Sequence, residues 1–136
     1  MTLTASTNVM KKLSSKNIVS PKGFKAAGIH CGLKHKKKDL AILVSDVPAS
    51  VAGVFTTNAV QAAQLKVTKD VVYTTKKIQA MIVNSGNANA CTGKQGVKDA
   101  QTMQALAAEK LGIAANLVGV CSTGVIGEIM NMEPVA

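Results

Sequence analysis

Ile78-Gln79-Ala80-Met81-Ile82-Val83 is an almost wholly apolar run, as expected for a strand that is covered on both faces of a sheet. A polar loop, residues 84–96, separates it from a segment whose apolar side chains recur every three or four residues, at Val97, Ala100, Met103, Ala107 and Leu111. This spacing predicts a helix, and Gly112 stands where a left-handed C-terminal cap is expected. A second apolar run, Leu117–Cys121, follows. The order strand, loop, helix, strand predicts a crossover unit whose two strands lie parallel in one sheet.

Two segments before this unit have the composition of a hairpin. Lys25–Leu33 and Leu40–Ser45 flank a lysine-rich tip, and Pro48 marks a turn after them. Val51–Thr57 carries the β-branched and aromatic side chains of a third strand, and Gln64–Thr68 is a candidate fourth. Together these segments predict the α/β (α+β) class, a layered sandwich of mixed β-sheet with covering helices.

The composition favours a core of small aliphatic side chains. The chain has 136 residues, one domain or less, and 47% are hydrophobic, but only two are Phe, one is Tyr and none is Trp. No stretch approaches the ~20 apolar residues of a membrane span. The first 17 residues lack the Arg of a mitochondrial presequence and the apolar region of a secretion signal, so we expect a cytoplasmic protein.

The net charge of +9 comes from the N-terminal part of the chain. All sixteen basic residues are Lys; nine precede the first acid, Asp39, and seven Lys balance seven acids from there on. We expect residues 1–19 to be a flexible basic leader and Lys34-His35-Lys36-Lys37-Lys38 to be the solvated tip of the hairpin. A patch for an anionic partner such as nucleic acid is the alternative, which the absence of Arg and the scarcity of aromatic residues disfavour.

Conventional catalytic and metal-binding arrangements are not visible. Cys31, Cys91 and Cys121 are odd in number and widely spaced, so we expect buried or half-buried free thiols rather than disulfides or a zinc site, and no bound metal. His30, beside Cys31, and His35 lack an obvious nucleophile partner, and the acids show no paired arrangement.

The loop Asn84-Ser85-Gly86-Asn87 lacks the glycine and lysine spacing of nucleotide-binding sites. Asn tolerates left-handed backbone and can bond its own loop, so we interpret this segment as a capped turn between a strand and a helix. A role in shaping the wall of an active site is the alternative.

Ser122-Thr123-Gly124-Val125-Ile126-Gly127 follows the second apolar run. It places a hydroxyl and a glycine at a strand end, where Gly124 leaves its backbone N–H unshielded and Thr123 can direct its hydroxyl into the same space. Two such donors are what a developing oxyanion needs. Turns of this composition are also common between elements, so the motif gains weight only from the motifs around it.

Those other motifs occur in order along the chain: Pro21-Lys22-Gly23-Phe24, Ala26-Ala27-Gly28, Asp39-Leu40-Ala41, Ala52–Asn58 and Val83–Gly93. With the hexapeptide they closely resemble the α-chain of the bifunctional ornithine acetyltransferase of arginine biosynthesis, also called glutamate N-acetyltransferase. The resemblance runs from Ser20 to Met132. Its most specific parts are Asn84–Gly93 and Ser122–Gly127.

The resemblance implies an enzyme that is made as one precursor and cleaves itself before a Thr, which becomes the first residue of a β-chain and acts as the nucleophile. Thr123 and Gly124 match the positions that stabilise the oxyanion. The Thr takes the acetyl group from N2-acetyl-L-ornithine and passes it to L-glutamate. The fold is then incomplete without the β-chain, and a heterotetramer of two α and two β chains is expected.

No cofactor is implied, although some members also accept acetyl-CoA as the acetyl donor. The nucleophile and the substrate-binding residues lie beyond Ala136, and Glu128–Met132 stands where relatives commonly carry prolines. Glu133-Pro134-Val135-Ala136 resembles the opening of a helix, so we expect residues 20–136 to be the N-terminal part of the α-chain domain, truncated at its C-terminus.

Two other functions remain as alternatives to acetyl transfer. A related N-terminal-nucleophile amidohydrolase or aminopeptidase would release the acyl group to water. A basic binding module would use Lys11–Lys38 on an anionic partner, with an affinity that falls steeply with salt. We expect small-molecule substrates, and neither a nucleic acid nor a membrane as partner.

Overall fold

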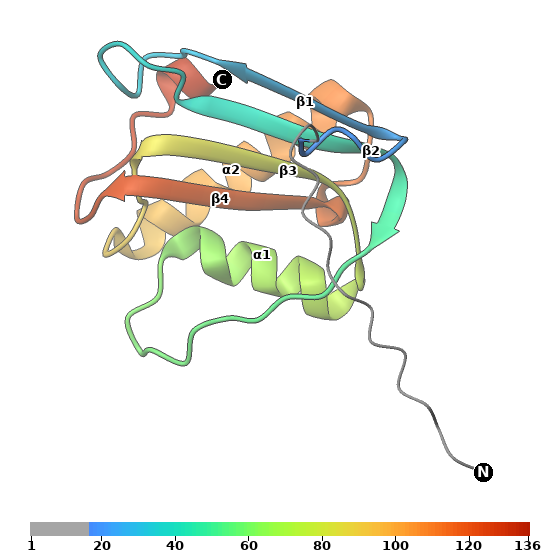
Figure 1. The fold of residues 1–136 in the computed structure, drawn as a ribbon. Helices are drawn as coiled ribbons and strands as arrows, with labels where there is room; N and C mark the ends of the chain where they lie inside the picture. Colours follow the sequence, from blue (N-terminus) through green and yellow to red (C-terminus); the bar gives the residue numbers. More distant parts are fainter. Residues whose placement is uncertain (1–16) are drawn as a thin grey trace.

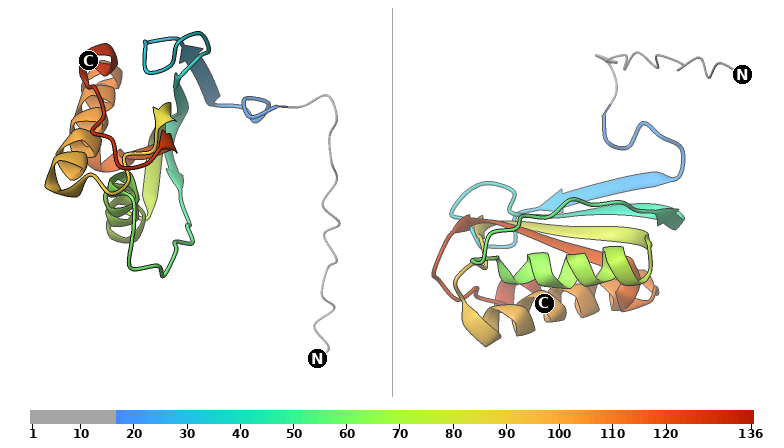
Figure 2. Two further views of the ribbon diagram at one scale, coloured as in Figure 1. Left: turned by 90° about the vertical axis from the view of Figure 1, so that its left-hand side faces the viewer. Right: turned by 90° about the horizontal axis from the view of Figure 1, so that it is seen from below.

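A computed structural model describes residues 17–136; the expected leader, 1–19, lies outside this part except for its last three residues. The described residues form an open, mixed four-stranded sheet with two helices on one face (Figures 1 and 2). The strands are β1 (Phe24–Ile29), β2 (Leu40–Ser50), β3 (Lys77–Asn87) and β4 (Val118–Val125). The helices are α1 (Ala63–Thr74) and α2 (Gly93–Leu111), and short 3₁₀ helices cover Ala115–Leu117 and Glu133–Val135.

The strands lie in the order β1-β2-β3-β4, and only the last pair is parallel. Helix α2 connects β3 to β4, so the predicted crossover unit is confirmed. Gly112 ends α2 in the left-handed conformation, with φ 64°, as expected. Because β3 runs on to Asn87 and α2 begins at Gly93, the loop between them is shorter than the predicted 84–96.

The core lies between the sheet and the two helices and consists of aliphatic side chains and methionine. Met103 of α2 and Val118 of β4 are fully buried at its centre, against Ala80 and Ile82 of β3. The two rings that contact each other, Phe55 and Tyr73, form an edge-to-face pair outside this cluster, with ring centroids 5.6 Å apart. The expected aliphatic core is therefore confirmed.

The prediction of a strand at Val51–Thr57 is wrong. Residues 51–62 belong to no helix or strand, and Val54 is fully exposed. Their β-branched and aromatic side chains suit a pleated surface, but β-propensity expresses packing against neighbouring strands, and this segment has none.

The prediction of a strand at Gln64–Thr68 is also wrong, because these residues begin α1. Val67, Val71 and Val72 recur at helical spacing and are buried on one side of that helix. Packing of this side against β4 and α2 outweighs the modest helix propensity of β-branched residues.

The hairpin of β1 and β2 is confirmed, with two changes of detail. β1 ends at Ile29, so that residues 30–39 form the tip, and β2 continues through Pro48 to Ser50. Pro48 therefore does not end the strand; it lies at an irregularity between Val44 and Ala49, where the ladder with β3 shifts register.

Candidate active site

The carboxyl ends of the parallel strands β3 and β4 meet at two glycines. Gly86 and Gly124 are register partners, with φ of 111° and 138°, which residues with a side chain rarely adopt. A Cβ on Gly124 would overlap the carbonyl group of Gly86 and lie 2.5 Å from the backbone nitrogen of Asn87. The two main chains thus approach each other as closely as only glycine allows.

The outer edge of β4 is covered by side chains of the two helices. Gln104 Nε2 donates to the carbonyl oxygen of Val118 (2.8 Å), and Gln64 Nε2 donates to that of Ser122 (3.2 Å). Between them, the Thr68 hydroxyl donates to the carbonyl oxygen of Val120 (2.7 Å) and accepts from its backbone N–H (2.8 Å). These bonds satisfy alternate residues of an edge strand without another strand.

The backbone N–H and C=O groups of alternate residues of β4 point to the same edge of the strand, so those of Gly124 follow the direction of Val120 and Ser122. Backbone groups of successive strand residues point to opposite edges, so the Gly124 N–H points away from β3, toward the outer edge of β4. The Thr123 side chain projects from the sheet face opposite the helices, because Ser122 beside it is buried toward them. Both Thr123 and Gly124 are exposed, so the two donors are adjacent and accessible.

The prediction of a capped turn at residues 84–87 is wrong, because these residues end β3; the turn held by its own side chains follows them, at residues 88–92. Asn89 has φ 45°, its backbone N–H donates to Asn87 Oδ1 (2.7 Å), and its Oδ1 accepts from the Thr92 hydroxyl (2.7 Å). Asn87 Nδ2 donates to the carbonyl oxygen of Glu128 (3.0 Å), and this fixes the chain just after the hexapeptide. The turn therefore holds both strand ends in place.

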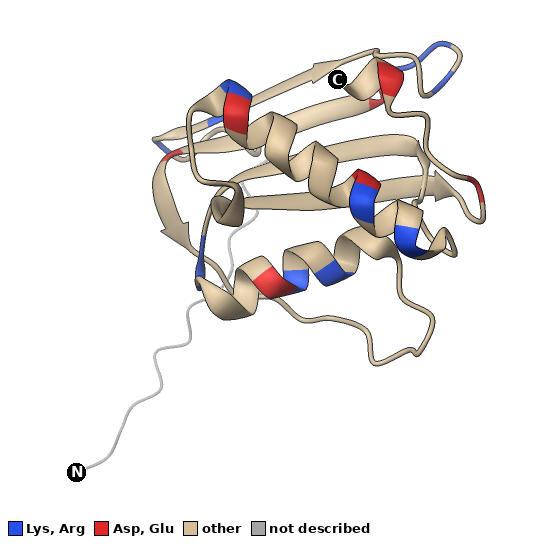
Figure 3. Ribbon diagram, turned by 180° about the vertical axis from the view of Figure 1, so that it is seen from behind, with Lys and Arg blue, Asp and Glu red and all other residues tan. Residues whose placement is uncertain are grey.

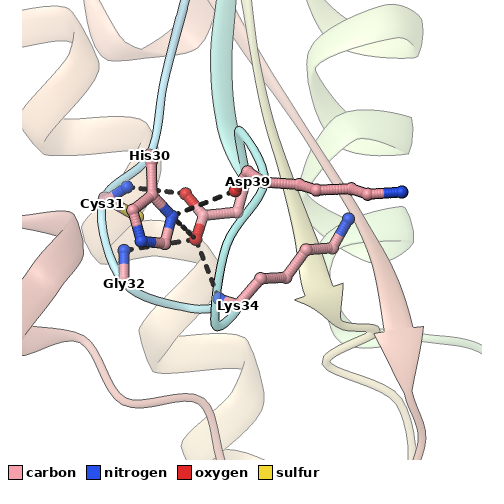
Figure 4. Close-up of polar contacts among 6 residues, drawn as sticks. His30, Cys31, Gly32, Lys34 and Asp39 are labelled. Carbon is pink, nitrogen blue, oxygen red and sulfur yellow. Dashed lines mark hydrogen bonds and ion pairs between the residues drawn. The ribbon is translucent and has the colours of Figure 1, made fainter.

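The tip of the β1–β2 hairpin is organised around a buried carboxylate, Asp39 (Figure 4). It accepts from the backbone N–H groups of Cys31 (2.6 Å), Gly32 (3.2 Å) and Lys34 (2.8 Å), and His30 Nδ1 lies 3.1 Å from it. Burial acts to raise the pKa of this carboxyl, but the backbone N–H donors outweigh burial and hold its pKa well below the usual range.

Asp39 also attaches the hairpin tip to β3. Its backbone carbonyl accepts from the Ser85 N–H (2.8 Å). A Cβ on the next residue, Gly86, would lie 2.9 Å from the carbonyl oxygen of Leu33 and 3.1 Å from Cγ of Lys34. The tip therefore packs on the strand end that also contacts Gly124.

The lysine-rich tip is only partly the solvated loop that the sequence predicts. Lys36, Lys37 and Lys38 are exposed, but Lys34 is half-buried. Figure 3 shows basic residues at this tip, whereas residues of both signs of charge lie on the helices.

The three cysteines are free thiols, as predicted, but only Cys31 has the partial burial that the sequence predicts. Cys31 is half-buried, and burial raises the pKa of its thiol. Cys91 and Cys121 are exposed, Cys121 because it projects from the sheet face that the helices leave uncovered. Within residues 17–136 no three His, Cys, Asp or Glu side chains are grouped to hold a metal ion, and no helix has the length and hydropathy to cross a membrane.

The sequence indicates Thr123 and Gly124 as site residues, but not the structural roles of Asp39 and Thr68. Two features of the sequence pointed to Asp39: it is the first acid after nine lysines, and it opens the motif Asp39-Leu40-Ala41. Thr68 had none, because the bonds that it makes depend on a helix that the sequence did not predict.

Known proteins have similar sequences and share this fold. A family model described as the ArgJ family matches residues 25–136. This chain belongs to the ArgJ family. Among curated relatives, the arginine biosynthesis bifunctional protein ArgJ of Streptococcus mutans is 58% identical over 122 residues, which are 90% of this chain and 31% of that protein. That of Geobacillus kaustophilus is 50% identical over 135 residues, 99% of this chain and 33% of that protein.

Solved structures of ArgJ proteins share the fold. The crystal structure of the arginine biosynthesis bifunctional protein ArgJ from Bacillus halodurans is 54% identical, with a TM-score of 0.89, over 92% of this chain and 65% of that one. Ornithine acetyltransferase from Mycobacterium tuberculosis, complexed with ornithine, is 40% identical, with a TM-score of 0.83, over 90% of this chain and 67% of that one. The predicted fold class and the family resemblance are therefore confirmed, and the chain spans about a third of the length of its curated relatives.

Proposed function

We propose that this chain is the N-terminal part of the α-chain of an acetyltransferase that moves the acetyl group of N2-acetyl-L-ornithine to L-glutamate. Membership of the ArgJ family supports the proposal, as do the names of its relatives, one of which is an ornithine acetyltransferase complexed with ornithine. The observation that carries it is the end of β4, where the Gly124 N–H and the Thr123 hydroxyl are adjacent and exposed.

In the proposed reaction, an N-terminal Thr of the β-chain attacks the acetyl carbonyl. Its α-amino group, with a pKa near ~8, takes the hydroxyl proton, so no His is required. The carbonyl oxygen becomes negative in the tetrahedral intermediate and accepts hydrogen bonds from Gly124 and Thr123. The amide nitrogen of the donor takes the proton as its C–N bond breaks. Ornithine then departs, and the acetyl group remains on the Thr as an ester. The amino group of glutamate then attacks this ester through a second intermediate of the same kind.

The same two donors would assist cleavage of the precursor, since that step also passes through a tetrahedral anion at a carbonyl. The cleaved product would be a heterotetramer of two α and two β chains in the cytoplasm, working without a cofactor. Use of acetyl-CoA as a second acetyl donor is compatible with this scheme, because the acetyl-Thr ester is the same.

Intact-mass analysis of the full-length gene product tests the proposal. We expect two chains, the second beginning with Thr, and release of ornithine that depends strictly on glutamate. Ornithine release that is independent of glutamate would favour the amidohydrolase instead. A single uncleaved chain without acetyl transfer would contradict the proposal.

The substitution Thr123→Ala tests the assignment of the oxyanion donor. Loss of one such donor lowers turnover by on the order of a hundredfold or more, and we expect slower precursor cleavage as well. Measured kcat and the fraction of cleaved chain check this. Unchanged turnover and complete cleavage would remove Thr123 from the site.

A further inference from the structure

Three polar side chains lie close together in the interior, where the ends of β3 and β4 are covered by the helices. Asn84 of β3 and Ser122 of β4 are register partners, and both are buried. Asn84 comes two residues after Ile82, so its side chain lies on the core side of the sheet, as that of Ser122 does. Gln64, in the first turn of α1, is also buried and bonds the carbonyl oxygen of Ser122. We call these three residues the strand-end cluster.

Each member of the strand-end cluster has one side-chain oxygen without a hydrogen-bond partner among residues 17–136. These atoms are Asn84 Oδ1, Gln64 Oε1 and Ser122 Oγ, and all three are inaccessible to solvent. A buried polar atom without a partner is destabilising, and native proteins contain few of them. Three such atoms on neighbouring elements therefore indicate a shared partner.

The orientation of the two amide groups is fixed by the hydrogen bonds that they make. Gln64 Nε2 donates to the carbonyl oxygens of Ala88 (3.1 Å) and Ser122 (3.2 Å). Asn84 Nδ2 donates to the carbonyl oxygen of Asn87 (2.9 Å). Exchanging oxygen and nitrogen in either amide would place two acceptors against each other, so Gln64 Oε1 and Asn84 Oδ1 are the atoms that still need donors.

The strand-end cluster has too few protons to satisfy itself. Its two amide oxygens can only accept, and the Ser122 hydroxyl has a single proton to donate. A water molecule supplies two protons and accepts through its lone pairs, so it can donate to both amide oxygens and accept from the hydroxyl. Neighbouring strands lie about 4.8 Å apart, and polar side chains at such a separation are commonly bridged by water.

We propose that the strand-end cluster binds one internal water molecule, which donates to Asn84 Oδ1 and Gln64 Oε1 and accepts from the Ser122 hydroxyl. Internal waters typically make about three hydrogen bonds to buried polar groups and are part of the structure. This water joins the start of α1 to the ends of β3 and β4. The inference does not depend on acetyl transfer, because it concerns only the interior of the fold.

A high-resolution crystal structure of the full-length protein tests the site directly. We expect an enclosed water molecule within hydrogen-bonding distance of the three oxygens. A structure in which these oxygens bond protein groups instead, or in which no water lies between them, would overturn the proposal.

The substitution Ser122→Ala tests the site in solution, because a hydroxyl that bonds water and one without a partner predict opposite signs. If the hydroxyl bonds the water, alanine removes a hydrogen bond and lowers the urea midpoint of the full-length protein by about 0.3 M or more. If the hydroxyl has no partner, alanine removes an unsatisfied polar atom, and the midpoint stays the same or rises. The second result would contradict the proposal.

Ser85→Ala is the matched control for this substitution. Ser85 is half-buried and follows Asn84 in β3, so its side chain projects from the opposite face of the sheet. We expect an unchanged midpoint for this variant, and a fall equal to that of Ser122→Ala would overturn the assignment to the strand-end cluster. Should Ser122→Ala not fold, the crystal structure of the wild type decides the question alone.

Discussion

The two edges of the sheet are held in different ways. At the β4 edge, Gln104, Thr68 and Gln64 bond alternate backbone groups from Val118 to Ser122. At the β1 edge, β1 is hydrogen-bonded to β2 on its inner side. The Asp39 carboxylate binds the loop that follows β1. The side-chain bonds at the β4 edge fix the backbone of a strand, whereas the Asp39 carboxylate fixes the loop at the hairpin tip. The candidate site lies where the two meet, at Gly86 and Gly124.

The largest effect is expected at that meeting point. Gly124→Ala would place a methyl group on the carbonyl of Gly86 at a φ of 138°, so the strand ends would have to separate. We expect turnover to fall at least a hundredfold and precursor cleavage to be impaired. Turnover and intact mass measure both. Gly127→Ala is the control, because its φ of 86° is also positive but no atom lies within 4 Å of its Cβ position. Near-normal turnover in Gly124→Ala would mean that the glycine contact does not shape the site.

The second largest effect is expected at the β1 edge, where the Asp39 carboxylate holds the tip of the hairpin. Asp39 has a pKa held below its ordinary value of 3.8, so the folded protein binds fewer protons than the unfolded chain between those two values. The stabilisation that Asp39 provides is therefore complete above its unfolded pKa and is lost as the pH falls toward the lowered one. We expect Asp39→Asn to destabilise the full-length protein at pH 7 and to flatten the dependence of stability on pH below about 4. Urea midpoints between pH 2.5 and 7 measure this. The same acid-induced loss in both proteins would contradict the role of Asp39.

The smallest effects compare the two edges directly. Thr68→Val removes a hydroxyl that bonds both backbone groups of Val120, and we expect a loss of about 1–3 kcal/mol in the free energy of unfolding. Lys25→Ala near the β1 edge breaks an ion pair with Asp46 whose side chains are 75% and 50% exposed. We expect a change below ~1 kcal/mol there. Urea unfolding of both variants checks the order, and an equal cost at both edges would show that the β4 edge is not held by its side-chain bonds.

The sequence predicts the crossover unit well because its signals agree. The apolar run at Ile78–Val83, the helical spacing from Val97 to Leu111 and the cap at Gly112 all indicate the same elements, and each element exists. Local preference and tertiary packing coincide in this unit.

Helix α1 escaped prediction because the two signals disagree there. Val67, Thr68, Val71 and Val72 have strand-like side chains, and the reason for their helical state is the surface of β4 and α2 on which they pack. That surface forms only when the protein folds, so the sequence shows only the local strand preference of these residues.

The candidate site divides in the same way. Thr123 and Gly124 are visible as a strand end followed by a small polar motif, which needs no tertiary information. The cluster around Asp39 needs the hairpin to bring residues 30–34 back to a carboxylate several positions later. The contact of Lys34 with Gly86 joins two segments more remote still, and no spacing in the sequence encodes it.

The contact between Gly86 and Gly124 has a consequence for how this molecule can change over generations. An added side chain at Gly124 meets the main chain of β3, and one at Gly86 meets the carbonyl of Leu33, so the obstacle in each case is backbone. Shortening a neighbouring side chain, such as that of Lys34 beside Gly86, leaves these backbone obstacles in place. Neither a single substitution at this pair nor a compensating substitution in a neighbouring side chain can therefore be accommodated. The two positions can be altered only if the backbone of both strand ends changes together.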